Sequence, residues 1–235
     1  MPAMFSRLKQ KTKEAVGKAH KTEYSAEFTA RCQEMETTKE HTSKLVDAYK
    51  HYSDAFGTRG SGSNKTEVMG ATAAALAQKV GPRSVKHHPY GVAVNGEKSS
   101  EFAHNLQQME KATSEVGKLQ RSLQESLANG TDELTSWIKR EYTDEFKKQK
   151  SSLERRRLEM DAASGKARAG DGGGGGAAEA HEAQLQTVEA ILAKLPAYQQ
   201  KHAAELKRML TAQHAYHQRA AAAVQRVVEG CKTPS

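Results

Sequence analysis

The stretch LQTVEAILAKLPAYQQKHAAELKRMLTAQHAYHQRAAAAVQRVVE (residues 185–229) carries a continuous heptad pattern. Residues that recur every seven positions share one face of an α-helix, and this spacing is typical of helices packed side by side. One seam consists of Leu185, Leu192, Gln199, Leu206, Gln213, Ala220 and Val227. A second seam consists of Val188, Leu195, His202, Met209, Tyr216 and Ala223. We therefore predict a long helix over residues 177–229, bent at Pro196 because proline lacks a backbone N–H.

Two upstream segments show the same helical periodicity. Residues 24–56 place Tyr24, Phe28, Met35, Leu45, Tyr49 and Phe56 on one face, and residues 97–163 do so with Phe102, Leu106, Leu123, Leu134, Phe146 and Leu153. Asn129 and Gly130 predict a kink within the second segment. A short helix is expected at 65–80, a loop at 81–96, and a flexible hairpin at the glycine-rich residues 164–176.

These segments predict an all-α fold, a long, kinked, antiparallel three-helix coiled-coil bundle. Each helix exposes an apolar stripe that it cannot bury alone, so the three must pack against one another. Polar seam positions such as Gln199, His202 and Gln213 weaken such a core, and burial against a second copy is the natural remedy. We therefore predict a homodimer, with an N-terminal helix at residues 1–22, the bundle at 23–230 and a tail at 231–235.

The N-terminal stretch MPAMFSRLKQKTKEAVGKAHKT (residues 1–22) predicts a short, basic amphipathic helix. Such helices lie in membrane interfaces with their apolar side inserted. The candidate insertion residues are Met4, Phe5, Leu8 and Val16. The surrounding cations, which we expect to contact lipid headgroups, are Arg7, Lys9, Lys11, Lys13 and Lys18.

A second group of cations lies toward the end of the second long helix. The chain has 36 Lys and Arg against 28 Asp and Glu, a formal net charge of +8, which favours phosphate-rich partners. Each basic side chain near an anionic leaflet contributes about 1 kcal/mol. We therefore predict that an anionic phospholipid membrane contacts Lys139, Arg140, Lys147, Lys148, Lys150, Arg155, Arg156, Arg157, Lys166 and Arg168.

Several other classes of protein are disfavoured. No apolar run approaches the roughly 20 residues that span a bilayer, so we expect a cytoplasmic, peripheral membrane protein. Cys32 and Cys231 are far apart and lack a partner motif, so we expect no metal and no cofactor. The sequence has no catalytic constellation, which argues against an enzyme. It also has no zinc finger or basic leucine zipper, which argues against nucleic-acid binding.

Three segments, in order, resemble a known family. YTDEFKKQKSSLERRRLEMDAA (Tyr142–Ala163) resembles the end of the second helix of endophilin-type BAR domains. Glu34-Met35-Glu36 followed by Thr42-Ser43-Lys44 resembles their first helix, and AQHAYHQRAAAAVQRV (Ala212–Val227) resembles the end of the third. The chain is thus similar to endophilin-like N-BAR proteins.

The resemblance implies a crescent-shaped dimer with a membrane-facing concave surface, an insertable N-terminal helix and positive arm tips. It implies sensing, generation or tubulation of curved membranes in endocytosis or vesicle trafficking. Endophilins also carry a C-terminal SH3 domain, and we expect that function to be absent or to lie outside the sequence given, which stops at CKTPS. The alternative reading is a coiled-coil adaptor or scaffold that binds proteins such as small GTPases.

Overall fold

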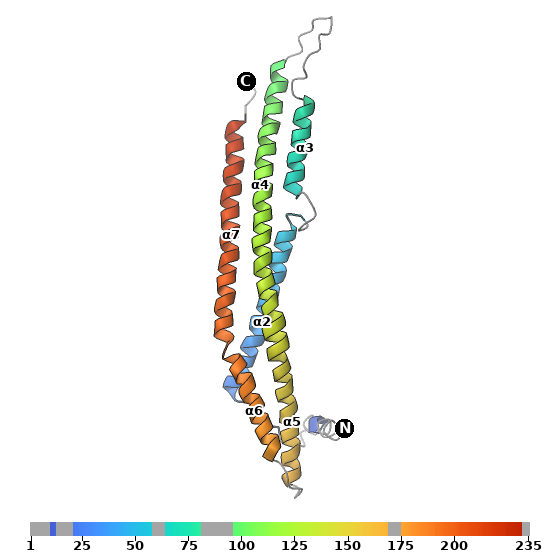
Figure 1. Ribbon diagram of the computed structural model, residues 1–235, viewed down its shortest axis with the longest axis vertical. Coiled ribbons are helices and arrows are strands. Elements are labelled where there is room, and N and C mark those ends of the chain that lie inside the picture. The colour runs from blue at the N-terminus through green and yellow to red at the C-terminus, as the bar shows by residue number, and fades with distance from the viewer. Residues whose placement is uncertain (1–9, 13–20, 58–63, 81–95, 169–174, 232–235) are drawn as a thin grey trace. The chain divides into compact units, whose positions relative to one another are not determined.

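The computed structural model describes residues 10–12, 21–57, 64–80, 96–168 and 175–231 (Figure 1). All the regular secondary structure within these ranges is helical, which confirms the predicted all-α fold. The helices are α2 (Ala26–Asp54), α3 (Lys65–Val80), α4 (Gly96–Trp137), the π-helix η1 (Ile138–Lys147), α5 (Lys148–Arg168), α6 (Gly175–Leu192) and α7 (Leu195–Gly230). The predicted loop at 81–96 lies almost wholly outside the described residues.

The described helices divide into two compact units. The first comprises residues 1–46 and 133–204, and the second comprises residues 47–132 and 205–235. Consequently α2, α4 and α7 each contribute residues to both units.

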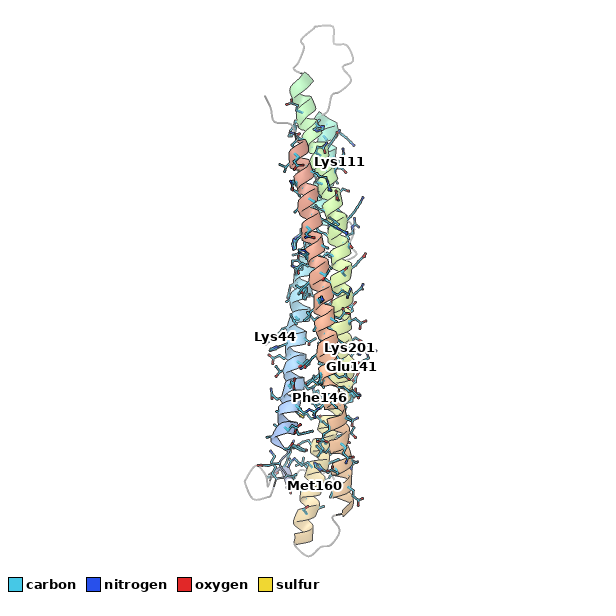
Figure 2. The ribbon with its side chains drawn as sticks, turned by 90° about the vertical axis from the view of Figure 1, so that its left-hand side faces the viewer. Lys44, Lys111, Glu141, Phe146, Met160 and Lys201 are labelled. Carbon is cyan, nitrogen blue, oxygen red and sulfur yellow. The ribbon has the colours of Figure 1, made fainter. Side chains whose placement is uncertain are left out.

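The first unit is built around a core shared by α2, η1, α5 and α6. Phe146, labelled in Figure 2, is 1% exposed in this core. Its neighbours are the buried residues Phe28, Cys32, Met35, Trp137, Leu153, Val188, Ile191, Leu192 and Leu195. All of these except Cys32, Trp137 and Ile191 are positions of the predicted seams, and hydrophobic burial explains why these helices pack together.

The contacts in the first unit define the directions of its helices. Glu145 pairs with Lys194, whereas residue 149, further along, pairs with residue 184, so α6 runs antiparallel to η1 and α5. Figure 1 shows α5 and α6 side by side. Polar seam residue Gln199 donates to Glu34 and Thr38 of α2, at 2.8 and 3.3 Å. This residue therefore finds its partners within the chain and does not need a second copy for them.

The second unit packs α4 against α3, α7 and the end of α2. Leu123, Leu127 and Met209 form one core, with Tyr49, Tyr52, Phe56, Ala212 and Tyr216 packed around it. Successive residues of α4 pair with progressively earlier residues of α7: His104 with Gly230, Glu115 with Arg226 and Gln120 with Tyr216. Hence α4 and α7 are antiparallel in this unit, as predicted for the bundle.

Three local predictions need correction. The kink expected at Asn129 and Gly130 is wrong in position, because α4 continues as α-helix to Trp137 and the irregularity is η1. There the Thr143 hydroxyl donates to the carbonyl of Ile138, five residues back, at 2.8 Å. The loop expected at 164–176 is shorter, since α5 continues to Arg168 and α6 begins at Gly175.

The third correction concerns Pro196, where a bend within one helix was expected. Instead α6 ends at Leu192 and a separate helix, α7, begins at Leu195. Pro196 thus occupies the first turn of α7, where its missing N–H leaves no helical hydrogen bond unmade. Proline therefore separates two helices here.

Candidate functional site

The predicted basic cluster lies on η1 and α5, in the first unit. Lys150 is half-buried, and its Nζ lies 2.5 Å from Oε1 of Glu36 on α2. The other described cations of the cluster, apart from Arg157, are exposed: Lys139, Arg140, Lys147, Lys148, Arg155 and Arg156. Most of the described cations in the cluster are therefore exposed to solvent.

The exposed cations differ in their acidic partners. Lys148 Nζ lies 3.4 Å from Asp144 Oδ1, and Arg156 Nη1 lies 3.1 Å from Glu159 Oε2. Such exposed pairs contribute little free energy and are easily exchanged for another anion. Among the described residues, no ion pair is formed by Lys139, Arg140, Lys147 or Arg155.

A shallow hollow of about 390 Å³ lies on this basic face. Thr143, Lys147, Ser151 and Arg155 follow one another at intervals of four residues, which places them on the same side of the helix. The complete lining is Thr143, Lys147, Lys148, Ser151, Ser152 and Arg155. Cationic groups and hydroxyl donors bind phosphate oxygens. The Thr143 hydroxyl already donates to the carbonyl of Ile138 and the Ser152 hydroxyl to Gln184, so Ser151 is the hydroxyl donor that this hollow offers.

The hydroxyl groups of this hollow were missed in the sequence analysis, which considered only charge. The signal was nevertheless present, because Thr143 and Ser151 alternate with Lys147 and Arg155 in the sequence at helical spacing. Reading hydroxyl donors together with cations would have identified the hollow.

Arg157 does not belong to this surface. Its side chain is only 2% exposed, and it pairs with Asp161 at 2.8 Å and with Glu154 at 2.7 Å. Three consecutive helical residues point in directions roughly 100° apart, so Arg155 and Arg156 face outward while Arg157 faces the interior. Arg157 is therefore a structural residue, and we withdraw it from the predicted headgroup contacts.

Most of the predicted N-terminal site lies outside the described residues. The residues concerned are Met4, Phe5, Arg7, Leu8, Lys9, Lys13, Val16 and Lys18. In the second basic group, the side chains of Lys166 and Arg168 near the end of α5 also lie outside the description. Lys11 is described and exposed.

Thr22, in the described N-terminal part of the chain, is hydrogen-bonded to α5. The backbone N–H and the hydroxyl of Thr22 donate to the two carboxylate oxygens of Asp161, at 3.2 and 2.5 Å. Asp161 in turn accepts a hydrogen bond from Arg157. Asp161, which is paired with the buried Arg157, thus connects Thr22 to the helix that carries the basic face.

The family-model comparison matches the BAR domain over residues 1–232. This chain belongs to the BAR domain family. No curated protein matches it significantly. BAR domains are membrane-binding scaffolds that sense or generate membrane curvature, and they are not enzymes. They generally dimerise.

Membrane-spanning helices and metal-binding clusters are both absent from the described part of this BAR domain. None of the described helices combines the length and the apolar character that crossing a membrane requires. Within the same described ranges, no three His, Cys, Asp or Glu side chains gather in a way that holds a metal ion.

Proposed function

We propose that this BAR domain binds anionic phospholipid headgroups through the basic face of η1 and α5. The observation that carries the proposal is the hollow in which Lys147, Lys148 and Arg155 lie beside the hydroxyl of Ser151. Lys147 and Arg155 have no acidic partner among the described residues, so headgroup phosphates supply the missing counter-charge. The protein acts as a peripheral protein on the cytoplasmic face of a membrane.

The direct test reverses two charges in the hollow, with Lys148→Glu and Arg155→Glu in one protein. The matched control is Lys44→Glu with Lys201→Glu, which changes the net charge equally at exposed positions of α2 and α7 (Figure 2). Losing two basic contacts costs at least about 2 kcal/mol, or about thirtyfold in vesicle affinity. Co-sedimentation with phosphatidylserine vesicles measures this difference, and equal losses in both proteins contradict a localised site.

Dimerisation is the second part of the proposal, and exposed apolar side chains in the second unit support it. Leu210 and Val224 lie two heptads apart on α7 and are 55% and 50% exposed. Phe102 and Met109 lie one heptad apart on α4 and are 51% and 36% exposed. Heptad-spaced apolar side chains are typical of a helical face that packs against another helix. A second copy of the chain is the occupant that the family's general tendency to dimerise favours.

Sedimentation equilibrium tests this interface. We expect Leu210→Glu with Val224→Glu to sediment as a monomer, because charges in an apolar interface lack partners. Leu45→Glu is the control, since Leu45 is 37% exposed but belongs to the first unit. A double variant that remains dimeric places the interface elsewhere.

The third part concerns remodelling, in the manner of endophilin-like N-BAR proteins in endocytosis or vesicle trafficking. An N-terminal amphipathic helix with Phe5 and Leu8 on its apolar side inserts into the headgroup region and displaces lipids there. We expect Phe5→Glu with Leu8→Glu to abolish tubulation of vesicles while leaving dimerisation intact. Electron micrographs that show unchanged tubules refute the insertion.

A further inference from the structure

A second and larger cavity, of about 560 Å³, opens in the first unit between α2 and the helices η1 and α5. Its volume lies in the range of sites that hold small ligands, about 300–1,000 Å³. It shares Lys147 and Ser151 with the basic hollow but differs from it in character, because its walls reach the hydrophobic core of the unit.

The inner wall of this cavity is apolar. Phe28, Cys32 and Leu153 line it, and their side chains are 7%, 5% and 1% exposed. Tyr24 adds an aromatic ring, whose centroid lies 5.0 Å from that of Phe28. Burial raises the pKa of the Cys32 thiol and raises the pKa of Tyr24 to about 12, so both groups are uncharged at neutral pH.

The rest of the lining includes three lysines, Lys11, Lys147 and Lys150. Lys150 is paired with Glu36, which does not line the cavity, whereas Lys147 has no ion pair with a described residue. The lining also includes one carboxylate, that of Glu154, but Arg157 donates hydrogen bonds to both of its oxygens. The charge that this cavity offers to a ligand is therefore positive.

We propose that this cavity binds an anionic amphiphile with a single apolar chain, such as a fatty acid or a lysophospholipid. The chain lies against Phe28, Cys32 and Leu153, where burying it removes apolar surface from water. The acidic group lies among the lysines, which supply charge-assisted hydrogen bonds. This site does not depend on the proposed membrane role, because its ligand binds as a single molecule.

Isothermal titration calorimetry with laurate, below the concentration at which laurate forms micelles, tests this proposal on the full chain. We expect saturable binding of one laurate per chain. Dodecyltrimethylammonium, which has the same chain length and the opposite charge, is expected to bind at least tenfold more weakly. Equal affinities for the two amphiphiles, or the absence of saturable laurate binding, overturn the proposal.

Two tryptophan substitutions locate the binding. Thr29 lines the cavity and is exposed, so Thr29→Trp fills the space without disturbing the core and lowers laurate affinity at least tenfold. Thr37→Trp is the matched control, since Thr37 is exposed on the same helix and does not line the cavity. Equal effects of the two changes overturn the assignment. Circular dichroism verifies that both proteins remain helical.

The same titration separates this site from the proposed membrane surface, although Lys147 and Ser151 line both. Lys148 and Arg155 line the hollow but not the cavity, so Lys148→Glu with Arg155→Glu leaves laurate affinity within twofold while weakening vesicle binding. Loss of laurate binding in that variant contradicts a separate site. Competition with bound laurate is the second arm, and we expect lysophosphatidic acid to displace it. If phosphatidylserine vesicles displace laurate to the same extent, a bilayer lipid supplies the chain, and this overturns the binding of a single free amphiphile.

Discussion

Met209 of α7 packs directly against the backbone of Gly130 in α4. A Cβ atom at position 130 would lie 2.4 Å from the Met209 sulfur and 2.7 Å from its Cγ, and Met209 is fully buried. Glycine thus permits a close approach of two antiparallel helices in the second unit.

We predict that Gly130→Ala destabilises the protein, although alanine is the better helix former. Overpacking costs about 1–3 kcal/mol, which exceeds the gain of about 1 kcal/mol in helix propensity. Gly165→Ala is the control, because nothing lies within 4 Å of a Cβ atom there. Urea denaturation should show a lower midpoint for the first variant and an equal or higher midpoint for the second. A stabilised Gly130→Ala protein contradicts the close packing.

The same glycine shows what helical periodicity predicts and what it does not. Heptad spacing identified seam residues such as Leu153 and Val188, which are 1% and 0% exposed, because burial of one stripe is what makes an isolated helix pack. In sequence, Asn129 and Gly130 predict a kink, because glycine weakens helices locally. Whether it kinks a helix or admits a neighbour depends on the opposing residue, Met209, which is 79 positions away in sequence.

The candidate site was predictable in the same partial way. Local charge density predicts a site in the segment of Lys147 and Arg155, and both side chains lie on one exposed face. Their contact with lipid headgroups stays a prediction. The inward orientation of Arg157 depends on how α5 is rotated against α2 and α6. A count of charges along the sequence gives no information on that rotation. The apolar cavity was not predicted, because Tyr24, Phe28 and Leu153 resemble ordinary core residues in sequence.

Arg157 gives a second prediction, which separates folding from lipid binding. Arg157→Gln leaves the Asp161 carboxylate, 4% exposed, without its cationic partner, and breaking a buried pair in this way costs about 3–5 kcal/mol. Arg155→Gln changes an exposed side chain and should alter stability by less than about 0.5 kcal/mol. Denaturant unfolding followed by circular dichroism compares the two. Equal stabilities are incompatible with a structural role for Arg157.

His202 gives a prediction about pH. Burial lowers its pKa below the ordinary value of 6.5. Its surroundings are neutral: the Thr42 hydroxyl from α2 lies 3.3 Å from Nδ1, and the Trp137 ring from α4 lies 4.5 Å away between centroids. The unfolded chain therefore binds the proton more readily than the folded protein does. The contribution of His202 to stability is complete above pH 6.5 and is lost as pH falls toward its lower folded-state pKa.

The pH prediction is checked by measuring the free energy of unfolding between pH 7.5 and pH 5. We expect His202→Gln to reduce the slope of the decline. His214→Gln serves for comparison, because His214 is exposed on the same helix. If both variants follow the same pH curve as the unchanged protein, His202 is not the group that titrates.

The last prediction concerns the attachment of α3 to α4. Asn64 and Glu67 form a capping box, in which the Glu67 N–H donates to Asn64 Oδ1 at 2.9 Å and the Asn64 N–H donates to Glu67 Oε2 at 3.0 Å. The Asn64 side chain also donates to the carbonyl of Gly117 in α4, at 3.0 Å. One residue thus begins the helix and fixes it to its neighbour.

We expect Asn64→Ala to remove both functions, at a cost of about 1 kcal/mol for the cap and a similar amount for the bond to Gly117. A loss of about 2 kcal/mol should accelerate amide hydrogen exchange in α3 roughly thirtyfold. Thr72→Ala, at an exposed position of the same helix, is the control and should have a smaller effect. Because the buried residues described in α3 are small, such as Ala73 and Ala77, packing alone supports it weakly. Unchanged exchange in Asn64→Ala means that this packing holds α3 without the cap.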